Sequence, residues 1–292
     1  MSQMKNNQNS FSDEELKKKK RISLIKTLIW IGIIIAAIIC LIPFYSMIIT
    51  STHANSEITR KLLLVPGDRL LANYERLVDV VPIWRGFVNS LIITVISTII
   101  GLYFSALGGY GFSKYNFKGN PILFAAVLAT MMVPGQLGII GFYRLMNEFG
   151  LLNTYWPLIL PSVSNAFALF FFKQVADASV PKEMMESARI DGCRELNIFH
   201  RIALPLMGPS LATLGIFLFI SKWNEFLQPM IILFDQELQT LPVLIASVRS
   251  QFNVDYGAQY VGIVISIIPI LIVFALFSKQ IIGNVMAGAI KE

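Results

Sequence analysis

The apolar residues of this chain gather into six long runs, and shorter segments between the runs carry most of the charges. The runs cover about residues 22–49, 87–112, 121–143, 156–172, 209–234 and 259–282. A membrane-spanning helix needs roughly 20 mostly apolar residues. Six runs of this length in one short chain distinguish membrane helices from buried core segments, which a single run could not do. The pattern therefore predicts an all-α polytopic membrane protein with six transmembrane helices.

Composition supports a membrane protein and excludes two soluble classes. Charged residues make up 14% of the 292 residues, against about 25% in ordinary globular domains, and the mean hydropathy is +0.63. These polar groups are too few to cover a surface that faces water on all sides. A soluble enzyme and a nucleic-acid-binding protein are therefore excluded, and we expect no nucleic-acid partner.

The chain has a net charge of +6, and the position of its basic residues predicts on which side of the membrane the termini lie. Five of the basic residues form one run directly before the first apolar run: Lys17, Lys18, Lys19, Lys20 and Arg21. Because cytoplasmic flanks of membrane helices collect Lys and Arg, we expect the N-terminus in the cytoplasm, and an even number of spans returns the C-terminus there.

The terminal segments are expected to lie outside the membrane domain. Residues 1–21 have a polar composition that cannot bury a core, so they are predicted as a disordered, basic cytoplasmic tail. The first apolar run is too long for a signal peptide and no cleavage pattern follows it, so it stays in the membrane. Residues 22–285 are then the six-span domain, and residues 286–292 form a cytoplasmic tail.

The segment 181–209, PKEMMESARIDGCRELNIFHRIALPLMGP, is unusually rich in charge for this chain. Pro181 suits the first turn of a helix, Glu183 suits its positive N-terminal end, and Gly192 can adopt the left-handed conformation that ends it. A second short helix would carry an apolar stripe at every third residue: Leu196, Phe199 and Ile202. We predict a helix–turn–helix along the membrane surface, called the 181–209 hairpin below.

Composition alone leaves open that such a hairpin merely rests on lipid headgroups, but its spacing is more informative. The pattern begins with Glu186 and Ala188. A glycine, Gly192, follows six residues after the glutamate, and Ile202 follows ten residues after the glycine, just before Leu204 and Pro205. This pattern resembles the EAA loop, the signature of permease subunits of binding-protein-dependent ABC importers. Ser187 departs from the family's usual alanine, and as a small residue it still permits close packing.

Other segments resemble the carbohydrate branch of that family, and the resemblance covers about residues 20–292. They are NSLIITVISTIIG, GYGFSKYNFKG, GLLNTYWPLILP, WNEFLQP and MAGAIKE. The chain is similar to the shorter permease of maltose-type and multiple-sugar systems. The resemblance implies the type I ABC importer permease fold in a bacterial cell membrane. It also implies partners: a second permease in a heterodimer, two ATPase subunits, an extracellular solute-binding protein and a sugar or oligosaccharide.

In the family the EAA hairpin is a coupling helix that docks in a groove of the ATPase. The resemblance therefore implies this role for residues 182–201, in which Glu186 would meet a basic group of the ATPase. The residues expected to take part in ATPase coupling are Glu183, Glu186, Ser187, Ala188, Asp191, Gly192, Arg194 and Phe199. The chain lacks the GxxxxGK[ST] phosphate loop, so we expect it to bind no cofactor. ATP and Mg²⁺ would belong to the partner ATPase, toward which the 286–292 tail would reach unless it is simply frayed.

Candidate sugar contacts are few. Trp223, Asn224 and Glu225 lie late in the fifth run, where an ionisable group within the membrane suggests a functional cavity. Interfacial anchoring is the alternative for this trio. Three further amides are more typical of hydrogen bonds between helices: Asn89, Gln136 and Asn165.

Two outer segments could meet a binding protein. Residues 247–260 correspond to a loop that in the maltose-type subunit enters the cleft of the binding protein, and an ordinary solvated loop is the alternative. Its candidate residues are Phe252, Asn253, Asp255 and Tyr256. The 50–86 segment is the second possible contact.

Three other functions stay open at this point. A peptide or amino-acid ABC permease is the nearest alternative, and WNEFLQP and MAGAIKE argue against it. An ion-coupled secondary transporter would use Glu225 as its ion site. An integral-membrane enzyme would need a side-chain cluster that two histidines, His53 and His200, do not supply, so we predict no catalytic or metal-binding residue.

Overall fold

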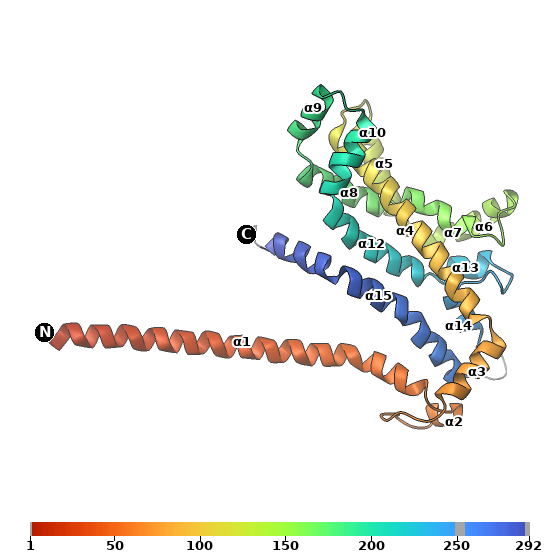
Figure 1. The fold of residues 1–292 in the computed structure, drawn as a ribbon, viewed down its shortest axis with the longest axis horizontal. Helices are drawn as coiled ribbons and strands as arrows, with labels where there is room; N and C mark the ends of the chain where they lie inside the picture. The colour runs from red at the N-terminus through yellow and green to blue at the C-terminus, as the bar shows by residue number, and fades with distance from the viewer. Residues whose placement is uncertain (1, 249–254, 290–292) are drawn as a thin grey trace.

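The computed structural model describes residues 2–248 and 255–289, and in these residues it is helical throughout, with no strand (Figure 1). The elements in chain order are α1 (Ser2–Thr50), α2 (Asn55–Ile58), α3 (Leu70–Val80), α4 (Ile83–Lys114), α5 (Asn120–Thr130), η1 (Gly135–Gly138), α6 (Ile139–Glu148), α7 (Trp156–Ile159), η2 (Leu160–Ser164), α8 (Ala166–Ser179), α9 (Lys182–Ile190), α10 (Glu195–Ile198), η3 (Phe199–Ala203), α11 (Leu204–Leu206), α12 (Gly208–Trp223), α13 (Leu227–Ile232), α14 (Leu241–Ser247) and α15 (Tyr256–Ala289).

Four segments of the described chain are long and apolar enough to cross a membrane as they stand: Leu24–Thr50, Ile83–Lys114, Trp156–Ser179 and Tyr256–Ser278. Two bent helix pairs raise the number to as many as six if each pair is one span. These pairs are Asn120–Thr130 with Gly135–Glu148, bent by 86°, and Glu195–Leu206 with Gly208–Trp223, bent by 78°. The all-helical polytopic fold is therefore confirmed, with four to six candidate spans in the part of the chain that the structure describes.

The third and fifth apolar runs are not the single helices that the sequence suggested. In the third run the helix stops after Thr130, because Pro134 lacks the N–H that would continue the helix. Pro134 then directly precedes a separate 3₁₀ turn, η1. In the fifth run α12 ends at Trp223, and the side chain of Asn224 turns back to donate to the Ile220 carbonyl at 2.9 Å. Apolarity alone does not reveal such breaks.

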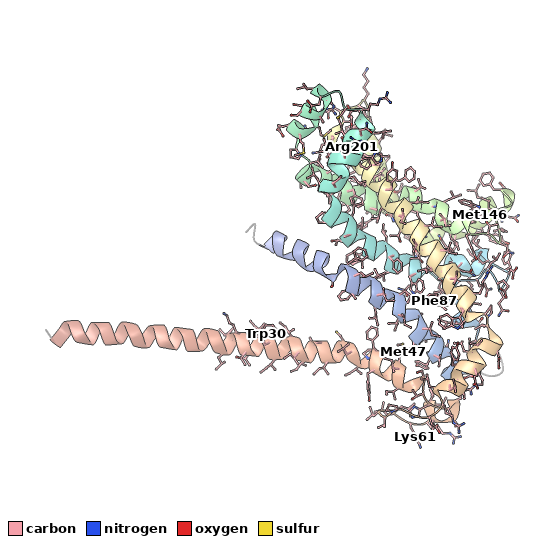
Figure 2. All side chains as sticks on the ribbon, viewed as in Figure 1. Trp30, Met47, Lys61, Phe87, Met146 and Arg201 are labelled. Carbon is pink, nitrogen blue, oxygen red and sulfur yellow. The ribbon has the colours of Figure 1, made fainter. Side chains whose placement is uncertain are left out.

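The N-terminal segment is continuous with the first span. Helix α1 begins at Ser2 and runs without a break into that span, and the division into a 1–21 tail and a 22–285 domain stays a prediction. Glu, Leu and Lys are good helix formers, and the segment directly precedes a helix that can extend into it. Figure 1 shows α1 leaving the rest of the molecule, and the apolar side chains of its span, such as Trp30 in Figure 2, are exposed.

Helix α4 is the central element of the fold, with α8 and α12 packed along it and α15 packed on α12 and α3. Small residues allow this close approach. A Cβ atom built on Gly109 would lie 2.6 Å from the Lys173 backbone nitrogen and 2.7 Å from the Phe172 carbonyl carbon. The glycine-rich end of α4 is therefore a packing surface for α8.

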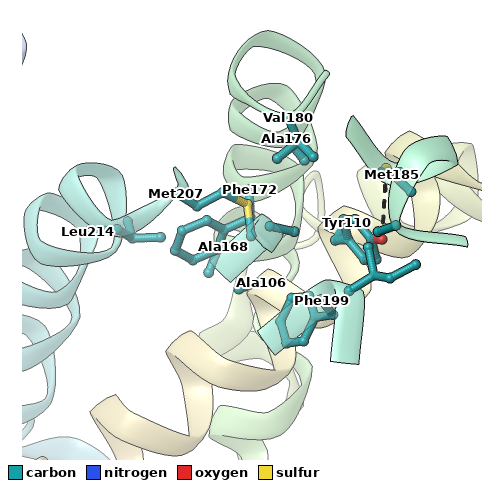
Figure 3. Packing of buried hydrophobic residues seen from close by; sticks show 13 residues of the cluster. Ala106, Tyr110, Ala168, Phe172, Ala176, Val180, Met185, Phe199, Met207 and Leu214 are labelled. Carbon is teal, nitrogen blue, oxygen red and sulfur yellow. Dashed lines mark hydrogen bonds between the residues drawn. The ribbon is translucent and has the colours of Figure 1, made fainter. Parts of the chain in front are cut away.

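The 181–209 hairpin lies at one end of this bundle and shares a core with it (Figure 3). The buried residues come from α4, α8, the hairpin and α12: Ala106, Tyr110, Ala168, Phe172, Ala176, Val180, Met185, Ala188, Ile198, Phe199, Ala203, Met207 and Leu214. The hairpin is therefore fixed to the membrane helices by a continuous apolar contact.

Candidate functional site

The first helix of the hairpin, α9, has one face packed on the bundle and one face open. Met185 and Ala188 are buried, three residues apart as helical spacing requires, while Glu183, Glu186 and Ser187 are exposed. The Ser187 hydroxyl donates to the Glu183 carbonyl at 2.9 Å. This bond satisfies the hydroxyl inside the helix, so serine fits the open face without disturbing α9.

The turn of the hairpin has the geometry predicted for Gly192. Its φ of +80° lies in the left-handed region, where glycine carries no Cβ penalty. The Cys193 N–H donates to the Ala188 carbonyl at 3.0 Å and the Gly192 N–H donates to the Arg189 carbonyl at 3.0 Å. This pair of bonds is the Schellman motif, which satisfies the last carbonyls of the helix.

An ion pair closes the hairpin across this turn. Arg189 Nε lies 2.7 Å from Glu195 Oε1, and Arg189 Nη2 donates to Glu195 Oε2 at 3.3 Å. The Tyr115 hydroxyl, on the residue that follows α4, donates to Glu195 Oε2, and the Arg189 guanidinium lies over the Tyr115 ring at 5.7 Å. The hairpin is thus tied to the end of α4 by a polar clamp of three residues, Tyr115, Arg189 and Glu195.

The clamp is favoured by the electrostatics of its members. The hydrogen bonds from Arg189 and Tyr115 lower the pKa of Glu195, which keeps this half-exposed carboxylate ionised. Burial and the hydrogen bond to Glu195 raise the pKa of Tyr115, so its hydroxyl stays protonated as a donor. The sequence analysis noted only that the 181–209 segment is rich in charge and did not predict the clamp. The opposite charges of Arg189 and Glu195 on the two sides of the predicted turn are the signal that could have revealed the ion pair.

The second half of the hairpin departs from the predicted stripe. Phe199 is fully buried and Ile202 is partly buried, but Leu196 is 60% exposed and Ile198 is buried instead. The reason is the π-helix Phe199–Ala203, whose wider turn shifts the register relative to regular helical spacing. The Phe199 ring packs at 5.4 Å from the ring of Tyr110, and the Tyr110 hydroxyl contacts Met185 Sδ at 3.8 Å (Figure 3).

The predicted coupling residues therefore divide into two groups. Ala188 and Phe199 are buried and hold the hairpin on the bundle. The others are exposed on the hairpin: Glu183, Glu186, Ser187, Asp191, Gly192 and Arg194. Exposed apolar side chains accompany them, with Met184 45%, Ile190 86% and Leu196 60% exposed. Polar groups around apolar anchors are typical of a surface that binds another protein.

A second candidate site is a polar cavity of about 150 Å³ inside the bundle. Its lining residues come from α4, the α7–α8 segment, α12, the link that follows α12, and α13: Ser97, Gly101, Pro161, Ser162, Asn165, Leu218, Lys222, Glu225 and Gln228. Lys222 Nζ lies 2.8 Å from Glu225 Oε2, and both side chains are about one-fifth to one-quarter exposed, at 21% and 24%. Lys222 Nζ also donates to the Leu158 carbonyl at 3.4 Å.

Of the three residues predicted for the substrate path, only Glu225 lines this cavity. Trp223 is 1% exposed, stacks on Phe219 with ring centroids 6.0 Å apart, and donates its indole N–H to the Ser266 carbonyl at 2.9 Å. Asn224 caps α12. Among the weaker candidates, Asn165 lines the cavity, whereas Asn89 donates to the carbonyls of the 237 and 239 positions.

At the opposite end of the bundle, Asp255 anchors the start of α15 to α3. Arg76 Nε lies 2.6 Å from Asp255 Oδ2, and the Ala258 N–H donates to Asp255 Oδ1 at 3.0 Å. Burial raises the pKa of Asp255, but these hydrogen bonds and the Arg76 charge outweigh burial and lower the pKa overall. Tyr256 is half-buried beside it. The other two candidates of this segment, Phe252 and Asn253, lie outside the described residues.

Comparison with known proteins places the chain in a family. Residues 97–282 match the family described as binding-protein-dependent transport system inner membrane component. The chain belongs to this family, so it is an inner-membrane component of a binding-protein-dependent transport system.

Particular relatives extend the match over nearly the whole chain. The arabinooligosaccharides transport system permease protein AraQ of Halalkalibacterium halodurans is 34% identical over 278 residues, covering 94% of this chain and 99% of the relative. The lactose transport system permease protein LacG of Rhizobium radiobacter is 32% identical, covering 88% and 93% of the two chains.

Solved structures agree on the fold. A chain of a bacterial ABC transporter involved in the import of the acidic polysaccharide alginate matches with a TM-score of 0.75 and 27% identity, covering 89% of this chain and 96% of that chain. The protein is therefore an all-α polytopic membrane protein with the type I ABC importer permease fold.

Proposed function

We propose that this protein is a membrane-spanning permease subunit of an ATP-driven sugar importer. It forms the translocation path with a second permease and couples to a separate ATPase through the 181–209 hairpin. Sugar as the substrate class is supported by the names of the relatives, which are permeases for arabinooligosaccharides, lactose and diacetylchitobiose. These names favour a sugar over the peptide or amino-acid alternative.

The observation that carries the coupling role is the construction of the hairpin. Its outer face is open and polar, while its inner face is buried in the same core as α4, α8 and α12. A rigid element seated in another subunit passes on a displacement that a flexible loop would absorb. When ATP closes the ATPase dimer, the hairpin moves as a unit and carries the packed helices with it.

The exposed face also has the chemistry of a docking surface. Ile190 and Leu196 supply apolar anchors, and Glu183 and Glu186 supply negative charge around them. Glu186 meets a basic group of the ATPase in this proposal. ATP and Mg²⁺ are bound by the two ATPase subunits and not by this chain.

The orientation follows from the same assignment. The hairpin, the basic N-terminal run and the C-terminal end of α15 lie in the cytoplasm. The α2–α3 segment and the Asp255 end of α15 face outward, where a binding protein delivers sugar. Asp255 and Tyr256 lie on this outer face, and Phe252 and Asn253 remain candidates for the same contact.

An ion-coupled transporter is disfavoured by the family match, because the family is described as a component of binding-protein-dependent transport systems. Glu225, the carboxylate that would serve as the ion site, is paired with Lys222 at 2.8 Å.

Charge reversal at Glu186 tests the proposal. In the complex purified from native membranes through an N-terminal tag, Glu186→Lys should insert normally but lower uptake of the sugar by about tenfold or more, because reversing an interface charge costs several kcal/mol. The measurements are membrane abundance, ATP hydrolysis and uptake of arabinooligosaccharides, lactose and diacetylchitobiose in proteoliposomes. Glu148→Lys, at the exposed end of α6, is the matched control. Undiminished uptake by Glu186→Lys would contradict coupling through the hairpin.

A further inference from the structure

The polar cavity lies deep within the membrane domain, at a place where a spanning segment is interrupted. Ser97 and Gly101 are near the middle of the 32-residue helix α4. Opposite them the Trp156–Ser179 span passes through the 3₁₀ turn η2 and then through Asn165, whose backbone is extended. Irregular backbone at membrane depth is tolerated only where it is buried in protein or lines a polar cavity.

Two polar atoms at this cavity lack a partner. Ser162 Oγ and Gln228 Oε1 are buried and have no hydrogen bond within the described residues, and Ser162 is only 7% exposed. Buried polar groups in native proteins nearly always have a partner, and an exception calls for a ligand or water to supply it. Both residues line the cavity, so the missing partners would come from its contents.

The charge of the cavity restricts what those contents are. Among the described residues that line it, Lys222 and Glu225 are the ionisable ones, and they neutralise each other. The lining offers hydrogen-bond donors and acceptors together, from the Lys222 ammonium, the Asn165 and Gln228 amides, the Ser97 and Ser162 hydroxyls and the Glu225 carboxylate. A hydroxyl group, which both donates and accepts, fits such a lining.

A carboxylated sugar fits less well. Its carboxylate would compete with Glu225 for Lys222, and one of the two anions would be left unpaired inside the membrane, where an uncompensated charge is very unfavourable. The described lining residues include no second cation that could compensate this charge.

We propose that this cavity is a binding subsite for an uncharged glycosyl unit during its passage through the membrane. Glu225 accepts from a sugar hydroxyl, Gln228 Oε1 accepts from another, and Ser162 Oγ completes its bonding with a third. This inference rests on the proposed function and deepens it, since it assigns a neutral rather than an acidic substrate class and gives this chain its own sugar contacts.

Cysteine accessibility tests the subsite in the purified complex. With Cys40 and Cys193 replaced by serine, Ser162→Cys places one thiol in the cavity. Ser105→Cys is the matched control, because Ser105 is also a buried serine whose hydroxyl lacks a partner but it does not line the cavity. The probe is methyl methanethiosulfonate, and the added sugars are arabinotriose, lactose, diacetylchitobiose and the acidic trigalacturonate.

We expect Ser162→Cys to react at least about tenfold faster than Ser105→Cys, and a neutral sugar that the complex imports to slow that reaction while trigalacturonate does not. Equal reaction of the two cysteines, or a reaction that no imported sugar slows, would overturn the subsite. Equal protection by trigalacturonate would overturn its preference for neutral sugars.

A charge variant gives the preference a second test. Glu225→Gln keeps a hydrogen-bonding side chain but leaves Lys222 without its anion, so trigalacturonate should now protect Ser162→Cys. Protection that stays absent would overturn the charge argument. Uptake by the wild-type complex separates the two proposals: failure to import any sugar counts against the proposed function, whereas import by the wild type without protection of Ser162→Cys counts against the subsite alone.

Discussion

The hairpin end of the molecule and its membrane cavity are built on opposite principles. At the hairpin, Met185, Phe199 and Met207 are almost completely buried, and the polar clamp lies on the outside of that packing. At the cavity the helices are not in close contact, and Lys222 and Glu225 form an ion pair inside the bundle. The difference indicates that the chain is rigid where it would transmit force and open where it would admit a polar substrate.

The largest expected effect breaks the rigid region. Phe199→Ala should destabilise the protein by about 3–5 kcal/mol, because it removes a fully buried ring that lies between the hairpin and α4. Thermal unfolding in detergent measures the loss. Phe149→Ala is the control, since Phe149 is 64% exposed. Equal effects of the two substitutions would show that the hairpin is not held by this core.

The next effect concerns the contact between α4 and α8. Gly109→Ala should cost about 1–3 kcal/mol, because its Cβ would lie 2.6–2.8 Å from Phe172 and Lys173 and the helices would have to separate. Gly111→Ala is the control two residues away, where a Cβ meets nothing within 4 Å. The measurement is again thermal unfolding, and a harmless Gly109→Ala would contradict the close packing.

A smaller effect belongs to the end of the bundle opposite the hairpin, where Asp255 joins α15 to α3. Because the folded pKa of Asp255 is lowered, its pairing with Arg76 stabilises the protein above about pH 4, the ordinary aspartate range, and the stability is lost as the pH falls through the folded pKa. Asp255→Asn should reduce this loss of unfolding free energy at acid pH by up to about 1 kcal/mol, since the ion pair is partly exposed.

Unfolding midpoints measured from pH 7 downward test this prediction. Glu57→Gln is the control, because Glu57 lies in α2, which packs against α15 at the same end of the bundle. If the unfolding midpoint falls equally with pH in the wild type and in Asp255→Asn, the ion pair does not anchor α15 to α3.

How far the sequence predicted these regions depends on how local the determining signal is. The Gly192 turn was predictable because a left-handed glycine after a short amphipathic helix is a local signal. The breaks after Thr130 and Trp223 were missed because each run was defined by its overall apolarity, which passes over single interrupting residues such as Pro134 and Asn224. The cavity was mostly missed because Ser97, Ser162 and Lys222 are far apart in sequence and come together only when α4, the α7–α8 segment and α12 pack.

The smallest effect on stability separates rigidity from coupling within the hairpin itself. Arg189→Ala removes an exposed ion pair, so the stability should fall by only about 0–1 kcal/mol. The same change releases Glu195 from the turn and weakens the link to Tyr115 at the end of α4. If the clamp keeps the hairpin rigid, sugar transported per ATP hydrolysed should fall although the unfolding midpoint barely moves. Lys118→Ala, an exposed cation after α4, is the control. An unchanged transport ratio in Arg189→Ala would mean that the buried core alone makes the hairpin rigid.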